Sequence, residues 1–170
     1  MRIIHCTQKL LKELDVPLIE PDKIPSSSEG LGNWYANLVG IDRRKCLLFT
    51  NEKTLYSFLI PKVLKNNLKN IEEEFLINLS HNLQYEGFKP DVINRVMQGY
   101  KEIGFAKTAS MKVLGAMNQL AFEYEVLVQG KEGFENVRII EMNRDINRTI
   151  MKGIKFFRPI EALKKLLQSI

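Results

Sequence analysis

The clearest hydrophobic pattern lies between residues 33 and 61, where three short apolar runs alternate with turn-forming residues. Successive side chains of Trp34–Val39 would point to opposite faces of a strand. Cys46–Phe49 is a continuous apolar run, typical of a strand covered on both faces. Thr54–Ile60 ends at Pro61, which cannot donate a hydrogen bond to a sheet. Because the connections are short, neighbouring strands should be antiparallel, and the stretch predicts a three-stranded meander.

In most of the remaining chain, apolar residues recur at three- and four-residue steps, a spacing typical of helices. Ser110 is a good N-cap for the longest of them, and Asn70 with Glu73 has the form of a capping box. Residues 135–148 fit a helix but tolerate a strand, and we interpret them as a helix. The other predicted helices cover residues 7–14, 70–86, 90–100, 110–128 and 159–170, and residues 62–69 form a short helical stretch.

These elements define an α+β fold class. Arg2–Cys6 predicts an N-terminal strand, and Gly104–Thr108 could add another. We predict a single domain over residues 1–170, with a small, mostly antiparallel sheet packed against about five helices. The sheet would consist of the central three-stranded meander and the N-terminal strand. A chain of 170 residues can bury a substantial core.

Residues 15–32 form a long loop that contains three Pro, a Ser triplet and two Gly and has no helical or strand period. A loop of this length within a compact domain is commonly either a binding loop or a disordered segment. Because it leads directly into Asn33, it could be a lid over that end of the meander. Both interpretations, lid and disorder, remain open.

Composition places the chain among ordinary soluble proteins, with 45% hydrophobic and 26% charged residues. No apolar run is long enough to span a membrane, and the first residues lack the apolar region of a signal peptide. Cys6 and Cys46 do not make a disulfide framework. We therefore expect a cytoplasmic protein without a membrane partner.

The net charge of +5 is concentrated near the C-terminus. Residues 138–170 contain eight Lys and Arg but only three Asp and Glu. Such a basic region can meet nucleic acid, an anionic membrane or an acidic partner. The alternative is a solvated surface without a partner.

One end of the predicted meander carries amides and an aromatic ring, which could orient a small polar ligand under the 15–32 loop. Asn37 could equally complete a hydrogen bond on a strand face, and Trp34 could belong to the core. The candidate ligand-binding residues at this end are Asn33, Trp34, Asn37, Thr50 and Asn51.

The opposite end of the meander is basic. Arg43 and Arg44 occupy the first turn, with Lys45, Lys62 and Lys65 nearby. A second arginine pair would lie one turn apart on the helix predicted for 135–148. Arginines can neutralise phosphates, so the candidate anion- or nucleic-acid-binding residues are Arg43, Arg44, Arg144 and Arg148.

No motif of high specificity for catalysis or cofactor binding is present, and we predict no catalytic residue, cofactor or metal. His5 and Cys6 lie together at the predicted strand–helix junction, but a zinc site usually needs three or four ligands. Only Cys46 and His81 remain as further His or Cys ligands. A buried thiol and a hydrogen-bonded histidine are the simpler interpretation.

Four segments together resemble a bacterial family of unknown function, over nearly the whole chain. They are IHCTQKLLKEL, LGNWYANLVGIDRRKCLLFTNEKTLYSFL, AKTASMKVLGAMNQL and INRTIMKGIKFFRPIEALKKLL. The resemblance implies a prokaryotic, cytosolic, single-domain protein and brings no catalytic residues. The segment Leu114–Asn118 is also similar to part of plasmid-encoded ORF-3-like proteins, which points to mobile-element biology.

Three hypotheses of function follow. The first is a non-enzymatic binding module for nucleic acid or a protein partner, based on the basic residues. The second is a small-ligand-binding protein or enzyme with its pocket at the Trp34/Asn51 end. The third is an interaction subunit of a phage or plasmid system. We favour the first, while ligand identity and oligomeric state are not predicted.

Overall fold

A computed structural model describes residues 1–27, 29–154 and 157–170. A five-stranded sheet forms its centre, with strand order β4-β3-β2-β1-β5. The strands are β1 (Arg2–Cys6), β2 (Trp34–Ile41), β3 (Arg44–Asn51), β4 (Ser57–Ile60) and β5 (Ile103–Lys107). The predicted meander is therefore present, because β2, β3 and β4 pair antiparallel in sequence order.

The sheet is mixed, and the prediction of a mostly antiparallel sheet was wrong. β1 pairs in parallel with both β2 and β5. Parallel neighbours need long crossover connections, and the chain provides them, since 27 residues separate Cys6 from Trp34. Those connections place the N-terminal strand inside the sheet, with β5 on the edge. The α+β class itself is confirmed.

Seven α-helices occur in the described part of the chain, rather than about five. Residues 135–148 are mainly helical, as predicted, and Ser110 caps the longest helix by accepting a bond from the Val113 amide. The helices are α1 (Gln8–Leu11), α2 (Lys65–Lys69), α3 (Ile71–Tyr85), α4 (Pro90–Gln98), α5 (Met111–Gly130), α6 (Ile139–Ile146) and α7 (Pro159–Gln168).

The predicted capping box at Asn70 is absent. α2 runs directly into α3, and the Asn70 side chain donates back to the Asn66 carbonyl. Its amide is therefore used to end α2 rather than to begin α3.

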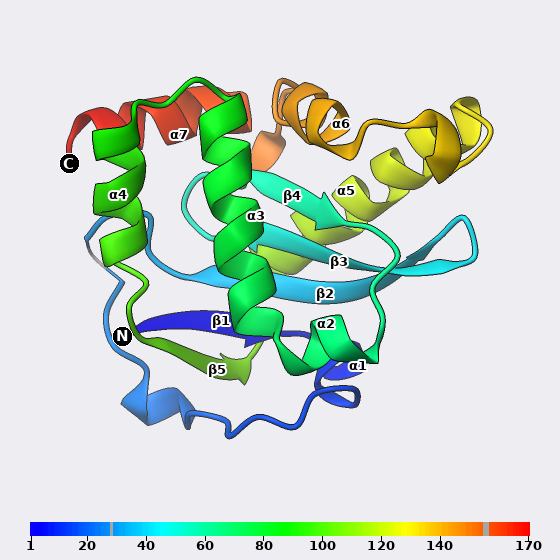
Figure 1. The fold of residues 1–170 in the computed structure, drawn as a ribbon. Coiled ribbons are helices and arrows are strands. Elements are labelled where there is room, and N and C mark those ends of the chain that lie inside the picture. Colours follow the sequence, from blue (N-terminus) through cyan, green and yellow to red (C-terminus); the bar gives the residue numbers. More distant parts are fainter. Residues whose placement is uncertain (28, 155–156) are drawn as a thin grey trace.

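The helices cover both faces of the sheet (Figure 1). One apolar cluster lies under α1, α2, α3, α4 and α7 and contains an aromatic group in which Phe75 meets Trp34, Phe49 and Phe58. The other cluster lies under α5 and α6. In Figure 1, α3 crosses in front of the sheet and α5 behind it. The sheet is thus buried on both sides, as the continuous apolar run in β3 suggested.

The segment 15–32 contains a short 3₁₀ turn at Pro21–Lys23 and follows the edge strand β5. The Ile19 amide donates to the Phe105 carbonyl, covering part of that edge. At its end, the Gly30 carbonyl accepts from Lys53 Nζ and the Asn33 amide donates to Glu52. The segment therefore reaches the bend between β3 and β4.

No helix in the described part of the chain could cross a membrane.

Candidate functional site

The amide-rich end of the meander is held together by Asn51, whose neighbour across the ladder is Trp34. Asn51 is fully buried, and its Nδ2 donates to the carbonyls of Leu31 and Asn33. Its Oδ1 accepts from the amides of Lys53 and Thr54 and from the Thr54 hydroxyl. One side chain therefore shapes the bend after β3 and ties it to the end of the long loop.

Trp34 is fully buried, and its indole Nε1 donates to the Tyr100 hydroxyl at 2.7 Å. The Tyr100 hydroxyl donates in turn to the Gly32 carbonyl. Burial raises the pKa of Tyr100, which keeps this hydroxyl protonated and able to donate. The ring of Trp34 therefore belongs to the aromatic core and does not line an opening.

The other three ligand-binding candidates also bond to the chain itself. Asn33 Oδ1 accepts from the Ile3 amide, and Asn37 Oδ1 accepts from the Thr7 hydroxyl at 2.7 Å. The Thr50 and Ser57 hydroxyls bond to each other across the β3–β4 ladder. All five side chains therefore support the fold, and a role for them in ligand binding stays a prediction.

An apolar groove of about 540 Å³ opens beside this same end of the sheet. Lys53 and Thr54, directly after Asn51, form one wall, and α7 forms the other with Ala162 and Leu166. Sequence patterns gave no signal for this groove because it depends on how α7 packs near the bend.

The two arginine pairs lie at opposite ends of β3. Arg44 begins that strand, whereas Asn147, beside Arg148 at the end of α6, bonds to Ser57 opposite the other end. The four predicted arginines therefore do not form one surface.

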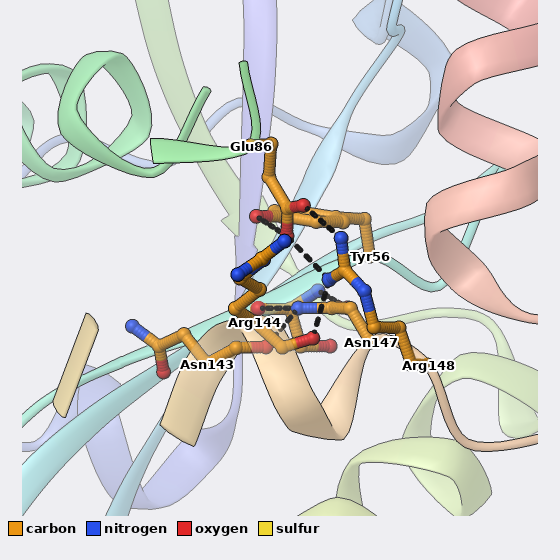
Figure 2. Close-up of polar contacts among 7 residues, drawn as sticks. Tyr56, Glu86, Asn143, Arg144, Asn147 and Arg148 are labelled. Carbon is orange, nitrogen blue, oxygen red and sulfur yellow. Dashed lines mark hydrogen bonds and ion pairs between the residues drawn. The ribbon is translucent and has the colours of Figure 1, made fainter. Parts of the chain in front are cut away.

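Arg148 is committed to an internal ion pair, shown in Figure 2. Its Nη2 lies 2.7 Å from Glu86 Oε2, and the Glu86 side chain is only 1% exposed. The Tyr56 hydroxyl donates to the same carboxylate at 3.1 Å. Burial, and next the charge of Glu86, raise the pKa of Tyr56, so the phenol stays neutral. Arg148 and Tyr56 together therefore hold the buried carboxylate of Glu86 in place.

Next to this ion pair, two buried asparagines fasten α6 to the edge strand β4. The Ser57 amide donates to Asn147 Oδ1, and the Leu59 amide donates to Asn143 Oδ1. The Tyr124 hydroxyl also donates to Asn143 Oδ1, at 2.6 Å. Arg144 lies outside this network, 5.8 Å from the centre of the Tyr85 ring. The end of α6 thus holds the edge strand β4 in place through its asparagines, and the Arg144 side chain takes no part in this network.

A surface rich in exposed cations lies at the hairpin end of the meander, and we call it the basic edge. Within the described residues only Lys45 among its members forms an ion pair, with Glu13. The members are Lys12, Arg43, Arg44, Lys45, Lys62, Lys65 and Lys69, all exposed.

Contacts between three parts of the chain build the basic edge. The Val63 amide donates to the Lys45 carbonyl at 2.8 Å, which brings the segment before α2 against the hairpin. Lys45 Nζ lies 3.3 Å from Glu13, just beyond α1. A groove of about 410 Å³ then opens between α1 and α2, lined by Lys12, Lys65 and Lys69 together with Glu13 and Asp15.

The hairpin turn that carries Arg43 is a tight one. Asp42 and Arg43 both have positive φ, at 49° and 58°, the conformation of a two-residue type I′ turn. Asp42 Oδ2 accepts from the Phe134 amide at 3.2 Å, so this carboxylate is used to anchor the turn. Arg43 and Arg44 therefore project from a fixed corner whose one acidic residue is already bonded.

No group of three His, Cys, Asp or Glu in the described ranges is placed to hold a metal ion. His5 is buried, bonds to the Lys107 carbonyl and stacks on Tyr35 at 4.7 Å. Burial raises the pKa of the Cys6 thiol to about 12, which disfavours the reactive thiolate. Neither residue is therefore set up as a nucleophile.

These features define an α+β protein with a mixed sheet, an interior whose polar groups bond to one another, and a basic exposed edge. The chain belongs to the family described as Domain of unknown function (DUF6933), whose family model matches residues 3–162. This agrees with the resemblance to a family of unknown function. No curated protein and no solved structure matches the chain.

Proposed function

We propose that this protein is a non-enzymatic module that binds double-stranded nucleic acid by contacting phosphates with the basic edge. One observation carries the proposal: the groove with Lys12, Lys65 and Lys69 is joined through Lys45 to Arg43 and Arg44 on the hairpin. Each contact with a phosphate would release counterions, which drives binding without base recognition.

Double strands suit this surface better than single strands. Single-stranded binding usually relies on aromatic rings on which bases stack. The exposed Phe and Tyr side chains in the described residues are Tyr85, Phe122 and Phe157, and none lies on the basic edge. A surface rich in Lys and Arg and without exposed aromatic rings fits the regular phosphate spacing of a duplex.

The test is fluorescence anisotropy with a labelled mixed-sequence DNA duplex of about 20 base pairs and its RNA counterpart, over about 50–300 mM salt. The double variant K65Q/K69Q should reduce the slope of log affinity against log salt by about 2 if each lysine contacts one phosphate. The matched control K164Q/K165Q removes the same charge from α7, where both lysines are exposed, and should leave the slope unchanged.

Two results would refute the proposal. One is the absence of binding to either duplex at the lowest salt. The other is an equal loss of slope in the two double variants, which would show that net charge and not the basic edge is responsible.

A second candidate function is the binding of a small amphipathic carboxylate in the groove beside α7. The observation that favours it is the groove's volume of about 540 Å³, within the range of ligand pockets, with Lys165 at its apolar wall. Calorimetry with decanoate should show binding that Ala162→Glu abolishes and that Gln168→Glu, outside this groove, retains. Heats indistinguishable from dilution would remove this candidate.

That the protein is bacterial, cytoplasmic and linked to mobile elements stays a prediction.

A further inference from the structure

The outward side of α5 is unusually apolar for a surface helix. Its inner side packs on the sheet through buried residues such as Met117, Leu120 and Tyr124. A helix of this kind normally presents charged residues to solvent. Instead Met111 is 80% exposed, Phe122 66% and Val126 49%.

These exposed residues form one continuous stripe. Each residue of a helix turns by about 100°, so residues three or four positions apart lie on the same side of it. The exposed apolar residues of α5 follow this spacing on its outward side. The stripe carries no charged residue over four turns of the helix. We call it the α5 stripe, and its members are Met111, Gly115, Asn118, Phe122 and Val126.

Packing against the described residues does not explain why a glycine occupies position 115. A Cβ atom at this position would meet nothing within 4 Å, so packing does not require a glycine. Glycine inside a helix is unfavourable relative to alanine. It does leave a shallow gap in the stripe between Met111 and Phe122, which a large side chain of another molecule could fill.

We propose that the α5 stripe is a dimer interface, on which a second copy of this chain packs with its own α5 antiparallel. A two-fold axis near Asn118 brings Phe122 of each copy over the gap at Gly115 of the other. The largest exposed side chain thus meets the smallest residue of the stripe, as a self-complementary interface requires.

The charges beside the stripe favour this occupant. Lys112 and Glu123 are eleven residues apart, so they lie on the same side of α5 and about 16 Å from each other along its axis. When two copies of a helix pack antiparallel about a two-fold axis, a given side of one copy lies next to the same side of the other copy. Lys112 of one copy then meets Glu123 of the other, twice in the dimer. Within the described residues Lys112 forms no ion pair of its own.

The α5 stripe is separate from the α1–α2 groove of the proposed nucleic-acid site, since α5 lies on the opposite face of the sheet from α1 and α2 (Figure 1). A contact made mainly by one helix is smaller than a standard interface, so association should be weak. The dimer would therefore form and dissociate with concentration.

Sedimentation equilibrium of the full chain over about 5–500 μM tests the proposal, because small interfaces associate in the upper part of such a range. The wild type should shift from monomer to dimer. Phe122→Glu should raise the dissociation constant about tenfold or more, since it places two carboxylates at the centre of the contact. Ile77→Glu, at an exposed apolar position on α3, is the control and should behave like the wild type.

Charge exchange distinguishes this antiparallel pairing from any other contact. Lys112→Glu and Glu123→Lys should each weaken the dimer, and the double variant K112E/E123K should restore it. The two residues are too far apart in one chain to compensate for each other. A monomer throughout the range would overturn the proposal, and so would a dimer that the double variant leaves as weak as the single variants.

Discussion

The two ends of the meander use their polar residues in opposite ways. At the Asn51 end, amides and hydroxyls are buried and bond to the backbone that surrounds them. At the hairpin end, Arg43, Arg44 and Lys62 are exposed and form no ion pair within the described residues. The polar groups of the first end are thus bonded within the fold, while the second end carries exposed cations without ion-pair partners in the described residues. Amides in a turn-rich sequence are therefore weaker evidence for a binding site than cations that the fold brings together in excess over acids, as the seven Lys and Arg of the basic edge lie beside Glu13, Asp15 and the bonded Asp42.

The largest expected difference between the two ends is in stability. Trp34→Ala should lower the free energy of unfolding by about 3–5 kcal/mol, because it empties a buried aromatic site and leaves Tyr100 without its donor. The double variant R43A/R44A, on the exposed hairpin, should change it by less than about 1 kcal/mol. Urea unfolding followed by circular dichroism measures both. Equal effects would show that the contrast between the two ends is mistaken.

The next largest effect separates the two arginines of α6. Arg148→Ala should cost about 1–3 kcal/mol, because the Glu86 carboxylate would remain buried with only the Tyr56 hydroxyl as a donor from the cluster. Arg144→Ala should cost less than about 1 kcal/mol, since the Arg144 side chain lies over the exposed Tyr85 ring and the variant keeps the carbonyl that accepts from Arg148. If the two variants unfold at the same urea concentration, Arg148 is not the structural residue described here.

Stability should fall as the pH rises above about 9–10. Burial raises the pKa values of Cys6, Tyr56, Tyr100 and Tyr124 in the folded state. Above the ordinary values, near 8.5 for cysteine and 10 for tyrosine, the unfolded chain releases protons that the folded chain keeps. The unfolded state is therefore favoured increasingly with pH.

Unfolding in urea at about pH 8 and pH 11 measures this loss, since the two values bracket the ordinary tyrosine pKa. Tyr56→Phe should make the loss smaller, because one of the buried phenols no longer titrates. The wild type measured in parallel at both pH values is the reference for this change. If Tyr56→Phe loses as much unfolding free energy between the two pH values as the wild type, Tyr56 is not a neutral buried phenol.

The smallest effect on stability is expected for the basic edge. K65Q/K69Q should leave the free energy of unfolding within about 0.5 kcal/mol of the wild type, because both lysines are exposed and unpaired within the described chain. Any loss of duplex binding in this variant would then reflect lost contacts. A large drop in its urea midpoint would instead mean that these lysines support the fold.

Local patterns predicted much of the fold. The meander, the possible strand at 104–108 (found at 103–107), the Ser110 cap and the helix within 135–148 follow from alternation, helical spacing and turn residues. The parallel pairing of β1 could not be predicted, because it depends on where two long crossovers place the strand. The neighbours Trp34 and Asn51 were expected at the same end of the meander, and the ladder pairs them directly.

The candidate site was harder to predict because its partners are distant in sequence. Arg148 meets Glu86 across 62 residues, and no spacing rule reveals that this carboxylate is buried. Lys12 and Lys69 join the basic edge only because α1 packs beside α2. Lys45, Lys62 and Lys65 were identified from the sequence since they adjoin the hairpin end of the meander.

Chemical-shift mapping with a mixed-sequence DNA duplex tests the central claim most directly. In ¹H–¹⁵N spectra of the uniformly labelled protein, we expect salt-sensitive shifts for backbone amides in residues 12–15, 43–45 and 62–69. Residues 51–54 at the other end of the meander should stay unchanged. Shifts confined to residues 51–54 and 161–169, or none at low salt, would contradict it.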